Sequence, residues 1–567
     1  MTSEQPVEGV PDEPVELAPE QGGLALAGPG DAHTRADWER SAAVVLRRTG
    51  RLGDDQPDDA VWDVLTRTTL DGLAIPPLGT PGLLEGIVTS GRPARAGGWG
   101  VRTRVADREQ AVVDLDNGAT SLWVDAAADL PVLLDGVLLD LAPVVLDGTT
   151  PDRARAFLDL LTSVAPADGT NLGADPGSDG LVEIAGLARK AGVLAAVVDG
   201  TAVHDRGASD VQEVGYALAT GATYLRTLAA AGFDVSEAAR MVEFRLAATG
   251  DQFPTIAKLR AVRRGWARML ELSGAAPERA PMRIHAVTSR PMMSTYDPWV
   301  NMLRTTVATF AAGVGGADAV TVVPFDSPLG EPDDFGRRIA RNTSTLLLAE
   351  SHLGRVADPA GGAWSVEKLT DDLALAAWDE LGRIESDGLG AFEGRVARVA
   401  DRRADEVAHR TRPLTGLTEF PHLGETRPDR AGPGDDVRRW GAAFEELRDE
   451  PVAEPVFLAT MGSVAAHNTR ATWATNLFAA GGVAVEPAGP TEGVESVIAA
   501  HDGQRVACLA GSDAAYEQEG ADLVVALREA GVRRVVVAGT ADVGADDRCH
   551  AGIDALAFLR RTRGVLS

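Results

Sequence analysis

Polar side chains end two predicted strands in the middle of the chain. Residues 282–289 form a short apolar run typical of a buried strand, and residues 319–325 form a second one. Between them, residues 297–312 show the apolar spacing of a helix that lies on a sheet, followed by a glycine-rich end. Such units pack as right-handed parallel crossovers with their ligand-facing residues where the strands end. The strand-end residues are Thr288, Ser289, Phe325 and Asp326.

Strands and helices alternate on both sides of this unit. The strand-like runs before it are residues 72–78, 121–126, 144–148, 193–200 and 224–232. Alternation over this length predicts an α/β fold built as a (β/α)8 TIM barrel. From Pro455 to the C-terminus five more strands alternate with helices, which predicts a flavodoxin-like doubly wound domain. Its ligand edge would include Met461 to Asn468.

The predicted organisation has five parts. The lead is rich in Pro, Gly and acidic residues and buries too little apolar surface to order, whereas Thr34 to Arg48 has the pattern of an amphipathic helix. The parts are a disordered lead (1–32), an N-terminal helical segment (33–69), the barrel (70–390), a helical linker (391–453) and the flavodoxin-like domain (454–567).

Composition narrows the class of protein. The 567 residues carry a formal net charge of -29, which argues against nucleic-acid binding because that needs a basic face. Only two cysteines occur, so neither a disulfide framework nor a cysteine metal site is predicted. No basic leader begins the chain, and no run approaches the ~18 apolar residues of a membrane span. We therefore expect a cytoplasmic protein with no metal site, nucleic-acid partner or membrane partner.

The central block carries a resemblance to a known family. Its residues Arg283, His285, Thr288, Ser289, Asp297, Asn301, Arg304 and Thr305, followed by residues 337–351 and 356–378, resemble the adenosylcobalamin-dependent acyl-CoA mutases, methylmalonyl-CoA mutase above all. The match extends over about residues 180 to 380 and more weakly over the C-terminal domain. The resemblance implies a TIM barrel that binds an acyl-CoA ester and a flavodoxin-like domain that binds the cobalamin.

Catalytic residues of that family are missing from the barrel. The resemblance implies a Tyr-His pair over the acyl thioester, but in this chain Thr201 and Ala202 replace the pair, and Ala202 donates no hydrogen bond. His204 corresponds to a glutamine of the family and would lie on the same face if the strand continued. A solvated or capping histidine is the ordinary interpretation. The block that threads CoA in catalytic members is replaced by residues 92–105.

The cobalamin loop is altered as well. The family carries Asp-x-His-x-x-Gly, in which the histidine ligates cobalt and the aspartate orients it. Here His467 is present, but Ala465 stands at the aspartate position and Arg470 at the glycine position. A histidine without that support is typically a capping or surface residue. Later positions also depart from the family: Leu509 and Ala510 replace a serine pair, and a glycine pair reads Ala538 and Gly539.

These losses predict a non-catalytic subunit. The resemblance implies a heterodimer in which a large catalytic subunit binds adenosylcobalamin and the acyl-CoA substrate, whereas this chain binds no cofactor and supplies no catalytic residue. The first alternative is a self-sufficient mutase with a divergent site, using His204 or His467. The second alternative is a binding module for an acyl-CoA or a corrin, which Arg283, His285 and Arg304 would favour.

Overall fold

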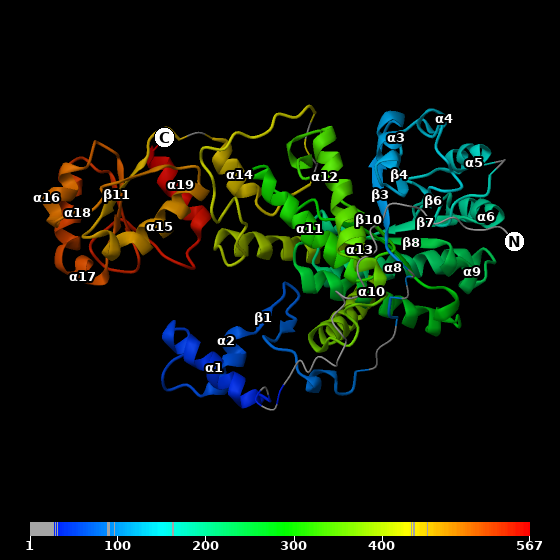
Figure 1. Ribbon diagram of the computed structural model, residues 1–567, viewed down its shortest axis with the longest axis horizontal. Coiled ribbons are helices and arrows are strands. Elements are labelled where there is room, and N and C mark those ends of the chain that lie inside the picture. Colours follow the sequence, from blue (N-terminus) through cyan, green and yellow to red (C-terminus); the bar gives the residue numbers. More distant parts are fainter. Residues whose placement is uncertain are drawn as a thin grey trace, which may run out of the picture. The chain divides into compact units, whose positions relative to one another are not determined.

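A computed structural model describes most of the chain (Figure 1). The described residues are 28, 30, 32–87, 91–93, 95, 97–161, 164–432, 434, 437–450 and 452–566. The predicted disordered lead lies almost wholly outside them. The chain forms two compact units, one of Met1–Arg67 with Ala74–Leu78 and one of Thr68–Leu73 with Gly79–Ser567.

The first unit has a small core of its own. Helix α1 (Arg35–Arg48) matches the predicted helix and begins with a capping box between Thr34 and Asp37. A short 3-10 turn, η3 (Asp58–Ala60), leads into α2 (Val61–Leu65). Buried Leu46 of α1 packs in one cluster with Val61 of α2.

The second unit contains a closed barrel of eight parallel strands, in the order β10-β3-β4-β5-β6-β7-β8-β9. The strands are β3 (Gly100–Val105), β4 (Ser121–Val124), β5 (Val144–Leu146), β6 (Asn171–Ala174), β7 (Leu194–Asp199), β8 (Val242–Ala248), β9 (Arg283–Thr288) and β10 (Ala319–Thr321). The helices that follow them are α3 (Arg108–Asp116), α4 (Leu130–Leu133), α5 (Pro151–Leu160), α6 (Leu181–Ala191), α7 (Thr201–His204), α8 (Asp210–Ala230), α9 (Val235–Arg240), α10 (Gln252–Leu272), α11 (Pro298–Val314) and α12 (Asp334–Thr345). The predicted TIM barrel is confirmed.

Several predicted strands were wrong in detail. Residues 72–78 contain β2 (Ala74–Ile75), which belongs to a separate two-stranded sheet with β1 (Arg67–Thr68). Residues 224–232 end helix α8, because their leucines and alanines pack at helical spacing. The prediction also missed β3, β6 and β8, whose sequences carry polar or charged residues that the barrel interior pairs. In β6, Gly173 has a φ of +69°, and a Cβ there would collide with the carbonyl of Leu146.

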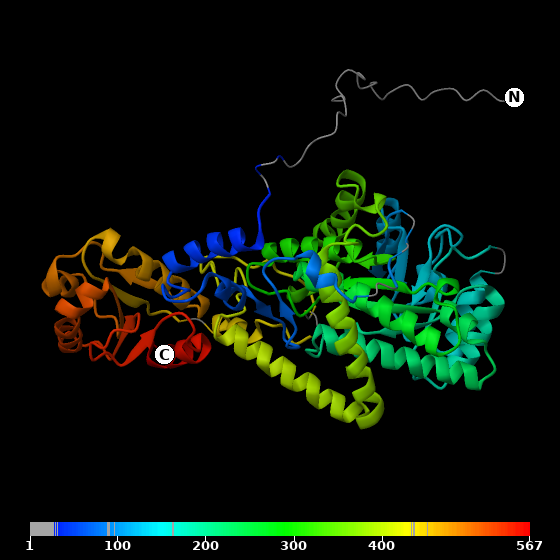
Figure 2. The same cartoon turned by 90° about the horizontal axis from the view of Figure 1, so that it is seen from below.

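A long helix follows the barrel. Helix α13 (Trp364–Ala408) is broken at Gly388, whose φ of 82° is non-helical. Figure 2 shows its two arms meeting at a sharp bend. An irregular segment and helix α14 (Ala442–Asp449) then lead to the C-terminal domain. Among the described residues, no helix is both long and apolar enough to cross a membrane.

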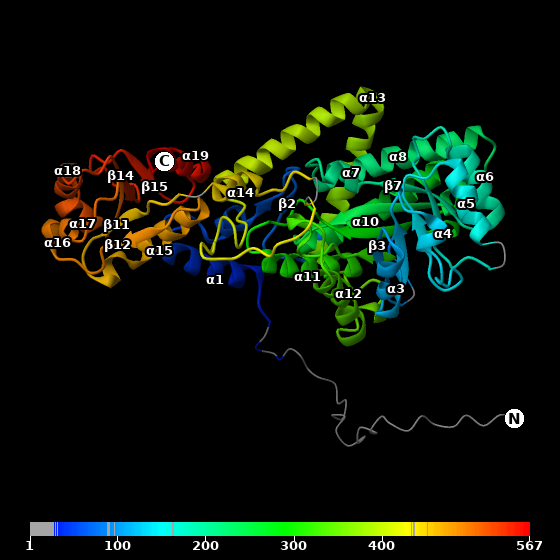
Figure 3. The ribbon, with the colours of Figure 1, turned by 90° about the horizontal axis from the view of Figure 1, so that it is seen from above.

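The C-terminal domain is a five-stranded parallel sheet in the order β12-β11-β13-β14-β15, the strand order of flavodoxin-like sheets. Its elements are β11 (Val456–Thr460), α15 (Val464–Ala480), β12 (Val485–Pro487), α16 (Gly493–Ala499), β13 (Val506–Ala510), α17 (Asp513–Ala515), η9 (Tyr516–Gly520, a π-helix), α18 (Ala521–Glu529), β14 (Arg534–Ala538), β15 (Asp547–Cys549) and α19 (Ala555–Leu566). Alternate strand residues enter two different clusters, with α15 and α19 on one face and α16 and α18 on the other (Figure 3).

Candidate functional site

A cavity of about 460 Å³ opens at the carboxyl ends of the barrel strands. Thr288 and Ser289, both predicted at a strand end, line it, together with Thr321 at the end of β10. Phe325 and Asp326 were predicted as strand-end residues, but β10 is shorter than predicted and ends at Thr321. Both are buried beyond the strand, and Asp326 accepts a hydrogen bond from Arg430 Nε at 2.7 Å.

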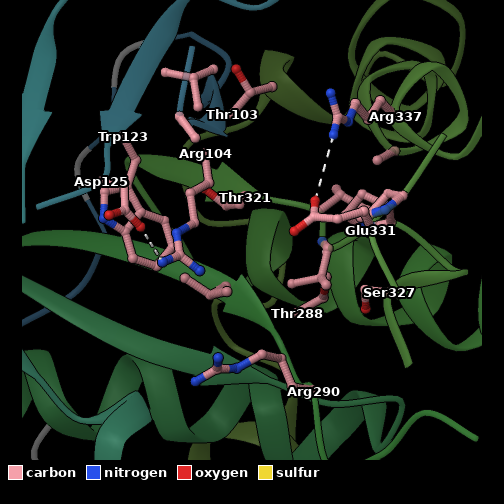
Figure 4. A pocket seen from close by; sticks show the side chains of 18 of the residues that line it. Thr103, Arg104, Trp123, Asp125, Thr288, Arg290, Thr321, Ser327, Glu331 and Arg337 are labelled. Atoms are coloured by element: carbon pink, nitrogen blue, oxygen red, sulfur yellow. Dashed lines mark hydrogen bonds and ion pairs between the residues drawn. The ribbon is translucent and has the colours of Figure 1, made fainter. Parts of the chain in front are cut away.

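The cavity wall carries arginines that are held by carboxylates (Figure 4). Arg104 lies 2.6 Å from Asp125, and Arg337 lies 3.8 Å from Glu331. A third arginine, Arg290, pairs with Asp205. Paired guanidinium groups and threonine hydroxyls suit a small polar ligand better than an apolar one.

The altered family pair lies in a helical turn. Strand β7 ends at Asp199, and Thr201 and Ala202 begin α7. Thr201 is buried, lines the cavity, and donates its hydroxyl hydrogen to Asp199 at 2.5 Å. Ala202 is exposed and has only a methyl group to offer. Neither position presents a proton donor free to act on a substrate carbonyl.

His204 does not continue the strand, and it is not solvated as predicted. It lies in α7 and is 3% exposed, because the turn folds it under the barrel mouth. Its Nε2 lies 2.7 Å from Ser289 Oγ, and its Nδ1 lies 3.7 Å from Glu213. Burial, with the charges of Lys258 and two arginines, lowers the pKa of His204 well below its usual value. The imidazole is therefore neutral near pH 7.

Glu213 serves the core rather than His204. Its Oε2 lies 2.7 Å from Lys258 Nζ, and its Oε1 accepts the Ala247 backbone N–H at 2.6 Å. Burial raises the pKa of Glu213 to about 7. Ser289, His204 and Glu213 thus lie in a row in space, as in a catalytic triad. The distance of 3.7 Å from His204 Nδ1 to Glu213 is too long for a hydrogen bond, however, and His204 does not itself line the cavity. Ser289 and His204 are consequently a buried hydrogen-bonded pair.

Charged side chains fill the barrel interior below the cavity. Arg102 makes two hydrogen bonds to Glu243, at 2.6 and 3.2 Å, and the pair is 3% and 0% exposed. His285 is fully buried, and its Nε2 lies 2.7 Å from Thr321 Oγ1. Burial and the neighbouring charges of Arg102 and Arg245 lower the pKa of His285 well below its usual value. The Arg102–Glu243 pair joins β3 to β8 across the barrel interior, and His285 joins β9 to its neighbour β10.

Arg245 occupies the centre of a second network. Its guanidinium lies 3.1 Å from Asp147, which follows β5, and 3.0 Å from Asp199, the last residue of β7. It also lies 3.9 Å from the ring centroid of Trp123. With 1% of its side chain exposed, Arg245 occupies the interior rather than a ligand surface.

The retained family arginines lie outside the cavity. Arg283 pairs with Asp168 at 2.8 Å, at the amino end of β9. Arg304 donates to Asn301 Oδ1 at 2.6 Å and to the Thr415 carbonyl at 2.7 Å. Burial lowers the pKa of Arg304 to about 10. Both arginines join elements of the fold.

The cobalamin-loop positions lie on helix α15. Ala465 is exposed in its first turn, and His467 is 6% exposed, so the prediction of a surface position for His467 was wrong. Arg470 donates to the Gly511 carbonyl at 2.6 Å and to Asp513 at 2.5 Å. Its guanidinium therefore bridges to the loop after β13, at the edge where doubly wound sheets bind ligands.

Tyr516 closes the same edge. Arg470 lies over its ring at 4.9 Å. The hydroxyl of Tyr516 donates to the Ala538 carbonyl at 2.8 Å and accepts the Gly511 N–H at 3.0 Å. Leu509 and Ala510 are buried in β13. A Cβ atom built on Gly539 would lie 3.5 Å from the Arg470 guanidinium. Tyr516 thus links the carboxyl ends of the neighbouring strands β13 and β14.

Sequence reasoning missed the arginines of the barrel mouth. Arg102 and Arg104 lie two residues apart on β3, so both point to the same side, one into the interior and one into the cavity. Two arginines two residues apart in a strand-like run could have indicated that one face of this strand is charged. No group of three or more His, Cys, Asp and Glu side chains in the described part of the chain is arranged to hold a metal ion.

Comparison with known proteins places the chain among mutases. A family model described as methylmalonyl-CoA mutase matches residues 190–442. The chain is 44% identical to a methylmalonyl-CoA mutase small subunit of Streptomyces virginiae, over 95% of this chain and 98% of that protein. It is 41% identical to a probable methylmalonyl-CoA mutase small subunit of Mycobacterium tuberculosis (89% and 92%). The small subunit of Propionibacterium freudenreichii subsp. shermanii is 35% identical (96% and 96%).

Proposed function

The chain belongs to the methylmalonyl-CoA mutase family, and on that premise we propose that it is the non-catalytic small subunit of a heterodimeric mutase. Its partner would be a large subunit that binds adenosylcobalamin and the acyl-CoA ester. The complex would interconvert (R)-methylmalonyl-CoA and succinyl-CoA by a radical mechanism, in the cytoplasm. The observations that carry the proposal are the paired charges that fill the barrel interior below its mouth and the Arg470 and Tyr516 hydrogen bonds at the edge of the C-terminal sheet.

The barrel interior does not fit a threaded CoA. An extended pantetheine needs an open path along the barrel axis, whereas Arg102, Glu243 and Arg245 are ion-paired there with at most 3% of each side chain exposed. Opening a path would leave buried charges unpaired, which costs about 3–5 kcal/mol for a single pair. The acyl-CoA therefore belongs to the partner in this proposal.

The C-terminal domain does not fit a cobalamin. His467 lacks a carboxylate at position 465 to orient it, and only 6% of its surface is exposed. Arg470 and Tyr516 hydrogen-bond across the strand edge that the nucleotide tail would enter. We therefore assign no chemical step of the reaction to this domain. Its role here is to keep the shape that the partner recognises.

The chain alone and the complex give different predictions. Purified alone, the chain should bind no adenosylcobalamin in equilibrium dialysis and turn over no methylmalonyl-CoA. Mixed with the large subunit of the same organism, it should form a one-to-one complex that turns over. Cofactor binding and turnover by the isolated chain would instead establish the self-sufficient mutase.

One observation favours a second function. The cavity at the barrel mouth is lined by Arg104, Arg290 and Arg337, and its volume of about 460 Å³ lies within the usual range of small-ligand sites. A binding module would hold a polar part of an acyl-CoA ester in this cavity without turnover. Calorimetric titration of the chain with acyl-CoA esters separates the two functions, because the subunit proposal expects no heat of binding.

A further inference from the structure

The barrel crossover between β4 and β5 is unusually short. Only the one-turn helix α4, four residues long, lies between these strands, whereas α8 and α10 have 21 residues each. Figure 1 shows α4 beside α3 and α5 at the outer edge of the barrel. A full crossover helix would cover this part of the barrel with an outward polar face. Here the loop of residues 134–142 covers this part of the barrel in place of a helix.

This loop forms an apolar groove. A hollow of about 330 Å³ has a mostly apolar lining that also includes two carboxylates: Pro131, Leu134, Val137, Leu138, Leu139, Leu160 and Val164, with Asp135, Gly136 and Asp140. Three large apolar side chains project beside it: Val132 is 61% exposed, Leu138 62% and Leu141 71%. Apolar side chains that gather on a protein surface in this way are typical of interaction sites.

Carboxylates surround the apolar side chains. Asp129, Asp135 and Asp140 are all exposed, and Arg108 pairs with Asp135 at 3.2 Å. The rim therefore keeps an excess of negative charge, as does the whole chain at -29. Protein interfaces commonly have an apolar centre and a charged rim that is complementary between the partners. A partner for this groove should bring apolar side chains flanked by lysine or arginine.

We propose that the groove receives an apolar, basic-flanked segment of the large subunit. The inference rests on the proposed function and adds to it the surface through which the small subunit holds its partner. The apolar anchors of that segment would fill the hollow between α4 and α5. Its basic residues would pair with Asp135 and Asp140, which also steers association at low salt.

The test compares two exposed leucine sites of matched exposure. The double variant Leu138→Glu/Leu141→Glu should weaken association with the large subunit at least tenfold in calorimetry. The control Leu272→Glu changes a leucine that is 61% exposed at the end of α10 and should bind like the unmodified chain. Circular dichroism and the melting temperature show that each variant is folded, because none of these side chains is buried.

Charge and solvent protection give independent measurements. Asp140→Lys should weaken association several-fold at low salt and reduce its salt dependence. Hydrogen exchange should show residues 130–142 more protected in the complex than in the free chain. Unchanged affinity of the double variant, equal weakening by the control, or no protection would overturn the groove while leaving the subunit proposal standing. Failure of the two chains to associate at all would overturn both.

Discussion

The barrel and the C-terminal domain depart from a catalytic mutase in different ways. In the barrel, Thr201 and Ala202 stand where the proposed function expects the Tyr-His pair of catalytic relatives, and a cavity remains at the mouth. In the C-terminal domain, a larger group, Arg470, stands where a glycine is expected and bridges the strand edge with Tyr516. One region keeps space without the chemical groups, and the other fills its space.

The two domains are also stabilised by different kinds of interaction. The barrel interior relies on buried charge pairs that tie strands distant in sequence, such as Arg102 of β3 and Glu243 of β8. The C-terminal sheet relies on apolar packing of both faces, with single hydrogen bonds closing its edge. Breaking a barrel pair should therefore cost more than breaking an edge bond.

The largest effect is expected from Glu243→Ala. Removing the carboxylate leaves Arg102 buried without its partner, and we expect the free energy of unfolding to fall by about 3–5 kcal/mol. Urea unfolding of the full chain measures it. The control is Glu393→Ala, whose partner Arg206 is largely exposed, and which should change stability by less than about 1 kcal/mol. Equal effects of the two would refute the dependence on buried pairs.

A smaller effect is expected at the edge of the C-terminal sheet. Tyr516→Phe removes one hydroxyl and leaves the Gly511 N–H and the Ala538 carbonyl without it, at a cost of about 1–3 kcal/mol. The matched control is Tyr216→Phe, since Tyr216 contributes its ring, stacked on Phe392. If both variants unfold at the same urea concentration, the hydroxyl of Tyr516 does not hold the edge.

The pH dependence should distinguish the barrel from the rest. The folded pKa of His204 is well below the unfolded value of about 6.5, so its contribution to stability is present above pH 6.5 and is lost as pH falls. His204→Gln should give a shallower loss of unfolding free energy between pH 6.5 and 5, by up to about 1.4 kcal/mol per pH unit. The exposed His422 changed to Gln serves as the control. Parallel pH profiles of all three proteins would contradict the prediction.

Much of the fold could be predicted because local pattern agreed with tertiary packing. Strands β11, β13 and β14 of the C-terminal sheet are apolar, β12 ends an apolar run, and β4, β5, β7 and β9 of the barrel follow the same rule. Strand β15 reads DRC, and no apolar run marks it in the sequence. Strand β8, by contrast, reads VEFRLAA and carries Glu243 and Arg245. Its charges are compensated by Arg102, Asp147 and Asp199, which lie 46 or more residues away in sequence, so no local window could recognise the strand.

The candidate site was predicted less completely for a related reason. Thr288 and Ser289 were placed correctly, because a strand end points to the barrel mouth. His204 was assigned to a continued strand, whereas the chain turns into α7 after Asp199 and buries the imidazole against Ser289. The identity of the groups around a side chain, which decides its exposure and pKa, depends on contacts that one sequence does not display.

The proposed complex takes no catalytic group from this chain. The most direct measurement is steady-state turnover of methylmalonyl-CoA by the reconstituted complex, with the small subunit carrying His204→Gln and His467→Ala together. Size-exclusion chromatography confirms that the variant complex forms. We predict kcat within about twofold of the unmodified complex, because neither histidine would contact the substrate. A twofold change corresponds to about 0.4 kcal/mol in the activation free energy. An intact complex whose kcat falls a hundredfold or more would contradict the account.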